Sequence, residues 1–174
     1  MDEGDWNKNK LIGNIAENIV EMMINSMPDW KCNKFGVETH IRDIKDLVRK
    51  SKNPIAIKIR KMPDFVAFNE KTGETLFIEV KYSSNFDRKN YFIEYLENYN
   101  KYWKGTKLII VRSKKPHFLY IDLEKIKNSM RKIKAVDEGW RTTWDFREIE
   151  QDIKDLFPDL KDEYIEEAIS RLKT

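Results

Sequence analysis

Two periodicities of apolar residues alternate along the chain and outline its predicted elements. Leu11 to Met27 carries apolar residues around most of a helical circumference, which predicts a long helix. Residues 64–68 and 75–81 instead read as two apolar-rich strands, and the six residues between them include Gly73. This pattern predicts a β-hairpin with its turn near Gly73.

The remaining segments predict further strands and helices in an α/β order. Strands are expected at residues 30–37, 55–60, 106–112 and 117–122. Helices are expected at residues 39–50, 87–104 and 122–133, followed after Gly139 by two helices that are separated at Phe157-Pro158. The predicted class is therefore α/β, with a central sheet, flanking helices and a C-terminal helical appendix.

Charged residues interrupt the second strand of the predicted hairpin. Because side chains alternate along a strand, Glu79 and Lys81 share one face, while Ile78 and Val80 share the other. Asp64, at the start of the neighbouring strand, is expected within a few ångströms of Glu79 and Lys81. Two carboxylates and an ammonium at one point suit a divalent metal ion and a bound water better than they suit a core.

Pro63-Asp64 followed by Glu79-Val80-Lys81 resembles the motif of the PD-(D/E)xK nuclease superfamily. The residue types of this motif do not by themselves identify the superfamily, since Pro28-Asp29 followed by Asp43-Ile44-Lys45 also matches the motif. That second match falls on a segment with helical spacing, which predicts an amphipathic helix with a solvated charged face. The first match lies on two strands joined by a turn. Its alternative interpretation is an edge hairpin with an exposed Glu–Lys pair.

The predicted first helix carries a second resemblance. Gly13-Asn14-Ile15-Ala16-Glu17 is similar to the first-helix signature of archaeal Holliday-junction resolvases and related members of the superfamily. In those proteins a glycine precedes by four positions an acidic residue that completes the metal site. The corresponding residue here is Glu17. Glu21 takes its place if the register is shifted by one turn, and a merely solvated Glu17 is the alternative.

The resemblance covers about Leu11 to Ile121 and implies a fold. It implies a restriction-endonuclease-like central mixed β-sheet flanked by helices. Residues 1–135 would form the nuclease-like core, and residues 136–174 would be a helical C-terminal extension of the same domain. The role of that extension is left open between covering the sheet, forming a dimer surface and contacting substrate.

The same resemblance implies an activity, a cofactor and site residues. The expected catalytic residues are Glu17, Asp64, Glu79 and Lys81. Asp64, Glu79 and the backbone carbonyl of Val80 would bind Mg²⁺ or Mn²⁺, with Glu17 as a further candidate ligand. Lys81 would hold or help deprotonate the attacking water and stabilise the transition state. The expected activity is that of a metal-dependent nuclease, a DNA endonuclease that leaves 5′-phosphate and 3′-hydroxyl ends.

Candidate nucleic-acid contacts lie on or before the predicted helix at residues 87–104. Arg88, Lys89 and Lys101 are the candidates for phosphate contacts. Four tyrosines at helical spacing suit either base stacking or packing, and packing is favoured because core residues share their face. They are Tyr91, Tyr95, Tyr99 and Tyr102. His40 is a metal-ligand candidate by resemblance to a few viral endonucleases, but a helix-boundary position is favoured.

Composition narrows the remaining possibilities. The chain has 174 residues, a formal net charge of +3 and one cysteine, so a single domain is expected and an intramolecular disulfide is excluded. Cys32 is expected to be a buried small hydrophobe. No apolar run approaches the length of a membrane span, and Met1 to Asp5 does not resemble a signal peptide. The expected location is therefore cytoplasmic, with no membrane partner.

Two functions from other classes remain open. The first is a protein of the same fold that binds nucleic acid without cutting it, and the second is a structural or interaction protein whose hairpin charges are surface decoration. A homodimer is also an open expectation, because cutting both strands of a duplex needs two active sites. Nucleic acid, in particular DNA, is the expected partner.

Overall fold

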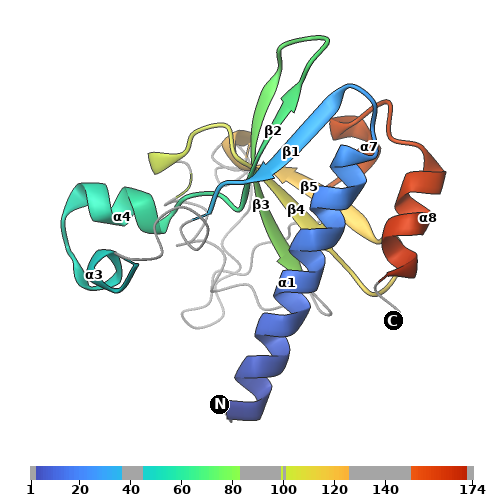
Figure 1. Ribbon diagram of the computed structural model, residues 1–174. Helices are drawn as coiled ribbons and strands as arrows, with labels where there is room; N and C mark the ends of the chain where they lie inside the picture. The colour runs from blue at the N-terminus through green and yellow to red at the C-terminus, as the bar shows by residue number, and fades with distance from the viewer. Residues whose placement is uncertain (1–2, 37–44, 83–98, 100, 126–149, 172–174) are drawn as a thin grey trace, which may run out of the picture.

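The structure is a computed structural model that describes residues 3–36, 45–82, 99, 101–125 and 150–171. Its described residues form an α/β fold around a six-stranded mixed sheet with the strand order β1-β2-β3-β4-β5-β6 (Figure 1). The pair β3–β4 is parallel, and every other neighbouring pair is antiparallel. The strands are β1 (Trp30–Lys34), β2 (Phe65–Asn69), β3 (Thr75–Tyr82), β4 (Lys107–Val111), β5 (Phe118–Asp122) and β6 (Gln151–Asp152).

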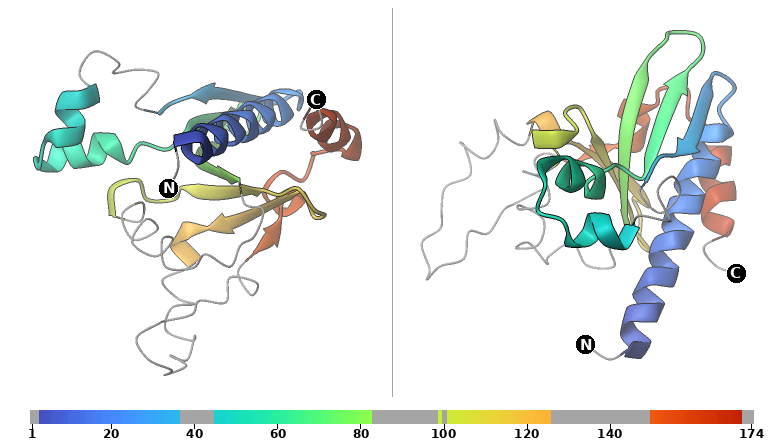
Figure 2. Two further views of the ribbon diagram at one scale, coloured as in Figure 1. Left: turned by 90° about the horizontal axis from the view of Figure 1, so that it is seen from below. Right: turned by 60° about the vertical axis from the view of Figure 1, so that its left-hand side comes forward.

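Helices cover one face of this sheet, and two further helices pack against each other. They are α1 (Glu3–Asn25), α3 (Lys45–Lys50), α4 (Pro54–Arg60), α7 (Ile153–Leu156) and α8 (Asp162–Ser170). The views of Figure 2 show α1 and α8 side by side on one face, with α3 and α4 at the opposite end of the molecule. None of the helices in the described ranges is long and apolar enough to cross a membrane.

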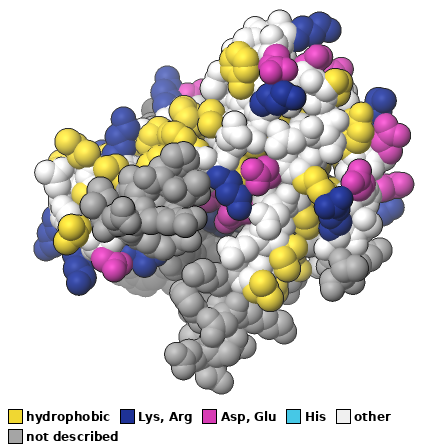
Figure 3. Space-filling model, viewed as in Figure 1, with side chains coloured by type: hydrophobic (Ala, Val, Ile, Leu, Met, Phe, Trp, Pro, Cys, Tyr) yellow, Lys and Arg dark blue, Asp and Glu magenta, His cyan; other side chains and the backbone are white. Residues whose placement is uncertain are grey.

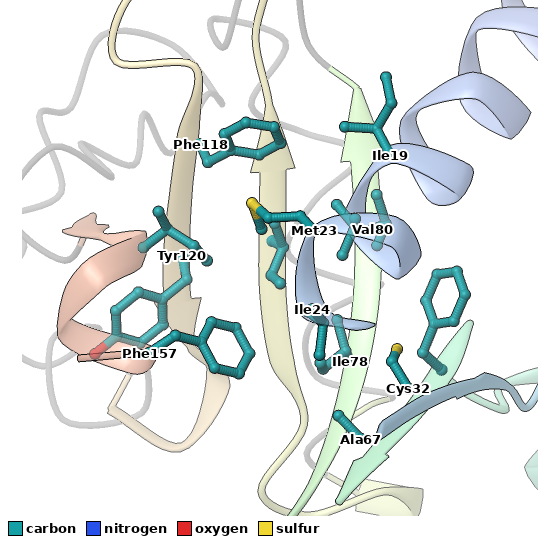
Figure 4. Close-up of a cluster of buried hydrophobic side chains, with 14 of the residues drawn as sticks. Ile19, Met23, Ile24, Cys32, Ala67, Ile78, Val80, Phe118, Tyr120 and Phe157 are labelled. Carbon is teal, nitrogen blue, oxygen red and sulfur yellow. The ribbon is translucent and has the colours of Figure 1, made fainter. Parts of the chain in front are cut away.

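The main hydrophobic core lies between α1 and the sheet. Met23 and Ile24 of α1 lie over Ile78 of β3, and all three side chains are fully buried (Figure 4). Cys32 joins the same cluster, which confirms its prediction as a buried small hydrophobe. Burial raises the pKa of the Cys32 thiol to about 12, with a further contribution from the charge of Glu21.

The predicted hairpin is confirmed. β2 and β3 pair in antiparallel register, with Phe65 opposite Ile78 and Ala67 opposite Leu76. Gly73 adopts a φ of 75° in the connecting turn, where a side chain would be strained. The long first helix is also confirmed, and it begins earlier than predicted, at Glu3.

The strand predicted at residues 55–60 is wrong, because these residues form the helix α4. The sequence Ile55-Ala56-Ile57-Lys58-Ile59-Arg60 resembles strand alternation, but the two residues before it start a helix. The Asn53 side chain accepts a hydrogen bond from the Ile55 N–H at 2.8 Å, and Pro54 occupies the first turn. An N-cap followed by proline at the helix start therefore prevails over the apolar alternation.

The C-terminal segment is more closely integrated than an appendix of two helices. The helices α7 and α8 are present, and α7 ends before Phe157 as predicted. The sequence did not reveal β6, which adds two residues to the edge of the sheet beside β5. Phe157 is fully buried and makes an edge-to-face contact with Trp30, with ring centroids 5.0 Å apart. This segment thus completes the main core.

Parts of four predicted helices lie outside the described residues, among them the first helix predicted after Gly139, whose residues up to 149 are not described. The structure describes the last part of the helix predicted at 39–50, which is α3. It describes residues 99 and 101–104 of the helix predicted at 87–104, and Tyr99, Lys101 and Tyr102 are helical. Of the helix at 122–133, it describes a helical turn at residues 123–125. The predicted strands at 30–37, 106–112 and 117–122 correspond to the shorter strands β1, β4 and β5.

Candidate active site

The last residues of β3 extend beyond the end of its pairing with β2, and this offset creates the candidate site. The paired register stops at Phe65 opposite Ile78. The Asp64 carboxylate takes up the next main-chain donor, because its Oδ2 accepts a hydrogen bond from the Val80 N–H at 2.8 Å. The main-chain carbonyl of Asp64 accepts bonds from the N–H groups of Phe35 at 2.8 Å and Gly36 at 3.3 Å. Asp64 is therefore held by both neighbouring strands.

Glu79 lies on the face of β3 that points away from α1, and it is only 1% exposed. The Tyr99 hydroxyl donates a hydrogen bond to Glu79 Oε2 at 2.7 Å. Lys81 Nζ forms an ion pair with Glu79 Oε1 and also donates to the main-chain carbonyl of Val80 at 3.0 Å. Since Lys81 is 38% exposed, its ammonium connects a buried carboxylate to the protein surface.

The surroundings of the Asp64 carboxyl disfavour its charged form. Its pKa is raised well above its usual value, chiefly because the surrounding protein removes water from it. The negative charges of Glu79 and Glu17 raise this pKa further, while the Lys81 ammonium and the Val80 N–H lower it. The structure therefore brings the other three predicted catalytic side chains close enough for their charges to act on Asp64.

Glu17 approaches this group from α1, on the edge between the helix's buried and exposed sides. It is half-buried, and the position of Gly13 one turn earlier opens onto free space. Glu21 instead acts on Cys32, whose pKa its charge raises. This difference supports the predicted register, in which Glu17 rather than Glu21 faces Asp64. Whether Glu17 binds a metal stays a prediction.

The oxygen atoms of the site suit a hard divalent cation. Asp64 and Glu79 provide carboxylates, and Val80 provides a main-chain carbonyl, which are the ligand types that Mg²⁺ and Mn²⁺ prefer. Two of these groups, Glu79 and the Val80 carbonyl, already bind one positive charge, the ammonium of Lys81. Among the described residues, no three His, Cys, Asp or Glu side chains converge closely enough to enclose a metal. The fit therefore rests on two carboxylates and a carbonyl.

Tyr99 is the contact that the sequence analysis missed. It was predicted to face inward on its helix, and it is 2% exposed, but its hydroxyl bond to Glu79 was not foreseen. A buried tyrosine usually has a partner for its hydroxyl, which was the available signal. The partner itself lies 20 positions away in the sequence and requires the tertiary fold.

An aromatic cluster adjoins the site on the same face of β3. Phe77 points to the side of Glu79, and its ring lies 5.6 Å from that of Phe35 and 5.4 Å from that of Trp103. Trp103 also donates its indole N–H to the carbonyl of Lys58 in α4 at 3.0 Å. These contacts connect the face that carries Glu79 to α4.

The predicted nucleic-acid contacts are described only in part. Lys101 is exposed, and its ammonium lies 5.2 Å from the centre of the Tyr102 ring. The other candidates lie outside the described residues. These are His40, Arg88, Lys89, Tyr91 and Tyr95. Their roles stay predictions.

Comparisons with known proteins add no assignment to this geometry. No protein-family model matches the chain. A search of curated proteins gives no significant match. The residues and contacts of the site itself are therefore the basis for inferring its function.

Proposed function

We propose that this protein is a metal-dependent nuclease, most specifically a DNA endonuclease, on a restriction-endonuclease-like fold. One observation carries the proposal. Asp64, directly before β2, accepts a hydrogen bond from the Val80 N–H, and Lys81 of β3 donates both to Glu79 and to the Val80 carbonyl, so a continuous run of contacts links the two carboxylates. Two neighbouring carboxylates beside a lysine, with Glu79 buried and Asp64 half-buried, are unfavourable in a core and useful for phosphodiester chemistry.

Asp64, Glu79 and the Val80 carbonyl would hold Mg²⁺ or Mn²⁺. When bound, this metal supplies positive charge for the scissile phosphate and makes water a better nucleophile at neutral pH. Lys81 reaches from the buried Glu79 to the surface, where its ammonium can hold the attacking water and offset negative charge that grows on the phosphate. The roles of these residues follow from the atoms that each presents to the site.

The surrounding groups keep the site in place. The Tyr99 hydroxyl fixes one oxygen of Glu79, and the Val80 N–H fixes one oxygen of Asp64. Each bond leaves further lone pairs on the carboxylate for other partners. Glu17 approaches from α1 and would add a third carboxylate to the site, either to the metal or to its water. The Val80 main chain and the Tyr99 hydroxyl thus each hold one carboxylate of the site.

Cleavage assays on a panel of substrates would test the proposal. Labelled linear duplex, single-stranded, flap and four-way-junction DNAs, together with RNA, would be incubated with Mg²⁺, with Mn²⁺ and with EDTA. We expect cleavage only with metal, and its abolition by Glu79→Gln, which keeps the polar shape but weakens metal binding. Glu74→Gln, at an exposed carboxylate in the hairpin turn, is the matched control. Equal activity of wild type and Glu79→Gln, or activity in EDTA, would assign the cleavage elsewhere.

Binding without cleavage is the second candidate, and one contact favours it. The Lys81 ammonium already pairs with Glu79 and donates to the Val80 carbonyl. An ion pair that only stabilises the fold would make the same contacts without any metal. Thermal unfolding with and without Mn²⁺ separates the two functions. A metal ion that binds the native site raises Tm by mass action, and Glu79→Gln should remove that shift. A DNA-binding protein with no metal-induced shift and no cleavage would support the second candidate.

A further inference from the structure

Residues 45–61, which contain α3 and α4, form a strongly basic unit. They include seven basic residues and one acidic residue, a net charge of +6, whereas the whole chain has +3 and the rest of it therefore −3. In the space-filling view, dark-blue side chains gather over α3 and α4, whereas magenta and dark-blue side chains are mixed over α8 at the other end (Figure 3). We call residues 45–61 the basic unit.

The basic unit is held together mainly by polar contacts. The Arg60 guanidinium donates to the carbonyls of Val48 at 3.0 Å and Ser51 at 2.9 Å, and also to that of Arg49. These carbonyls lie in the last turn of α3 or directly after it, where the helix leaves its acceptors unsatisfied. Arg60 therefore caps α3 from α4 and fixes the angle between the two helices. Its charge serves the unit's own structure.

The basic unit contributes little to the cores of the protein. Among the side chains of the unit that the structure describes, residues 46–61, only Val48 and Ala56 are buried, whereas Leu47 is 71% exposed and Ile55 is 70% exposed. Concentrating charge of one sign on so small a unit destabilises a compact fold by self-repulsion. Folding alone therefore does not account for this concentration of lysine and arginine.

The basic unit is firmly connected to the candidate active site. Lys58 gives its carbonyl to the Trp103 indole at 3.0 Å, and its ammonium lies 5.2 Å from the centre of the Trp103 ring. The chain then runs from Lys61 to Asp64 through two residues. The site itself contains the carboxylates of Asp64 and Glu79, which repel a polyanion. A fixed basic surface beside it would offset this repulsion.

We propose that the exposed face of the basic unit binds the phosphodiester backbone of duplex DNA next to the bond that is cut. This inference rests on the proposed nuclease function for its choice of partner. Duplex DNA presents one negative charge per ~1.7 Å of axis with both strands counted, and α4 spans about 10 Å, so roughly six phosphates lie along that length of duplex and only those on its near side can face α4. Lys50, Lys52 and Lys58 are exposed and supply the contacts. Sequence preference is not expected from backbone contacts of this kind.

The test is equilibrium binding of a fluorescently labelled 30-base-pair duplex in EDTA, measured by anisotropy over a range of salt concentrations. The variant Lys50→Gln/Lys52→Gln/Lys58→Gln neutralises the exposed face and leaves Arg60 in place. The control variant Lys31→Gln/Lys71→Gln/Lys114→Gln makes the same change in net charge at exposed positions on β1, the β2–β3 turn and the β4–β5 turn. Thermal unfolding would verify that both variants are folded.

We expect the basic-unit variant to lose about tenfold or more in affinity at low salt and to reduce the salt slope by roughly 2 to 3, whereas the control variant should bind as wild type. Equal losses in both variants, or none in either, would overturn the inference. Binding of wild type to phosphatidylserine vesicles in place of the duplex would also overturn it, because the surface would then serve a membrane.

The outcomes separate this inference from the proposed function. If wild type cleaves DNA in the presence of metal and the basic-unit variant keeps its DNA affinity, the nuclease function is supported and DNA binding by the basic unit is contradicted. If DNA binding depends on the basic unit but no metal condition gives cleavage, DNA binding by the basic unit is supported and the nuclease function is contradicted.

Discussion

The two faces of β3 differ in what they contribute to the protein. On the side of α1, Ile78 is fully buried and Val80 is 3% exposed, and both join the main core. On the other side, Glu79 is equally buried but charged, and it is paired with Lys81 and Tyr99. One strand thus alternates between residues that stabilise the fold and residues whose burial costs free energy.

This contrast shows why the candidate site is placed here. A carboxylate can be kept in a buried position only if the surrounding structure is rigid enough to hold it and its partners. The apolar face of β3 supplies that rigidity one residue away from each charged side chain. The stability of one face and the chemistry of the other should therefore be separable by mutation.

The largest effect is expected on the apolar face. Ile78→Ala removes a fully buried side chain from the contact between α1 and the sheet, and should lower the free energy of unfolding by about 3 kcal/mol. Urea unfolding followed by circular dichroism measures this change. Leu47→Ala, at a side chain that is 71% exposed, should change the same quantity by less than about 0.5 kcal/mol. Equal losses would remove the distinction between the core and the surface.

The next effect is expected on the charged face. Lys81→Ala leaves Asp64, Glu79 and the Val80 carbonyl in place but removes the ammonium beside them. Cleavage should fall by roughly 10²-fold or more, because a single electrostatic stabiliser of the transition state is lost. DNA affinity should change far less, since phosphate contacts are spread over several basic residues. Lys71→Ala is the control, and a Lys81→Ala enzyme with full single-turnover activity would contradict the assigned role.

A smaller effect is expected from Tyr99→Phe, which removes the hydroxyl donor to Glu79 and keeps the buried ring. A hydrogen bond to a charged group is worth about 1.5–3 kcal/mol, part of which water can replace, so the cleavage rate should fall about tenfold. The Mn²⁺ concentration that gives half-maximal rate should also change, because Glu79 is then less well positioned. Tyr102→Phe is the matched control. A merely structural role of Tyr99 would lower Tm without changing the dependence on Mn²⁺.

The smallest effect is expected to have the opposite sign. The raised pKa of Asp64 means that the native state binds this proton more tightly than the unfolded state, whose value is about 3.9. Wild type in EDTA should therefore lose stability as pH rises from that value through the raised pKa. Asp64→Asn has no such loss and should be about 1 kcal/mol more stable than wild type at pH 8, a Tm increase of roughly 3 °C.

Thermal melts of both proteins at pH 4 and pH 8 would test this sign, with the exposed Asp159→Asn as control. The advantage of Asp64→Asn should shrink toward pH 4, where the wild-type carboxyl is protonated. The same variant should not cleave DNA. A lower Tm for Asp64→Asn at pH 8 would show that the carboxylate stabilises the native protein and that its burial has been misjudged.

Local patterns in the sequence were sufficient for the hairpin and for the first helix. The alternation in residues 75–81 and the turn glycine Gly73 placed Glu79 and Lys81 on one face, as the structure confirms. The helical spacing after Leu11 likewise identified α1 and the side of it on which Glu17 lies. These features depend on neighbours within a few residues, which a sequence displays directly.

Features that depend on weak local signals or distant contacts were not predictable in the same way. Residues 55–60 have an ambiguous apolar pattern, and the decisive signal was the Asn53-Pro54 helix start that precedes them. The two-residue strand β6 is too short for a periodicity. The bond from Tyr99 to Glu79 arises only when a helix and a strand meet in three dimensions.

The parallel pairing of β3 with β4 also determines when the candidate site is completed during folding. The β2–β3 hairpin involves neighbours in the sequence and can form within microseconds, whereas parallel strands must wait for a long crossover to close. Tyr99 lies within that crossover, so its bond to Glu79 forms only when the crossover packs against β3. We expect that, as the chain emerges from the ribosome, the hairpin first brings Asp64 and Glu79 together and the contacts that surround them form last. Such an order would delay any cleavage until the whole sheet is assembled.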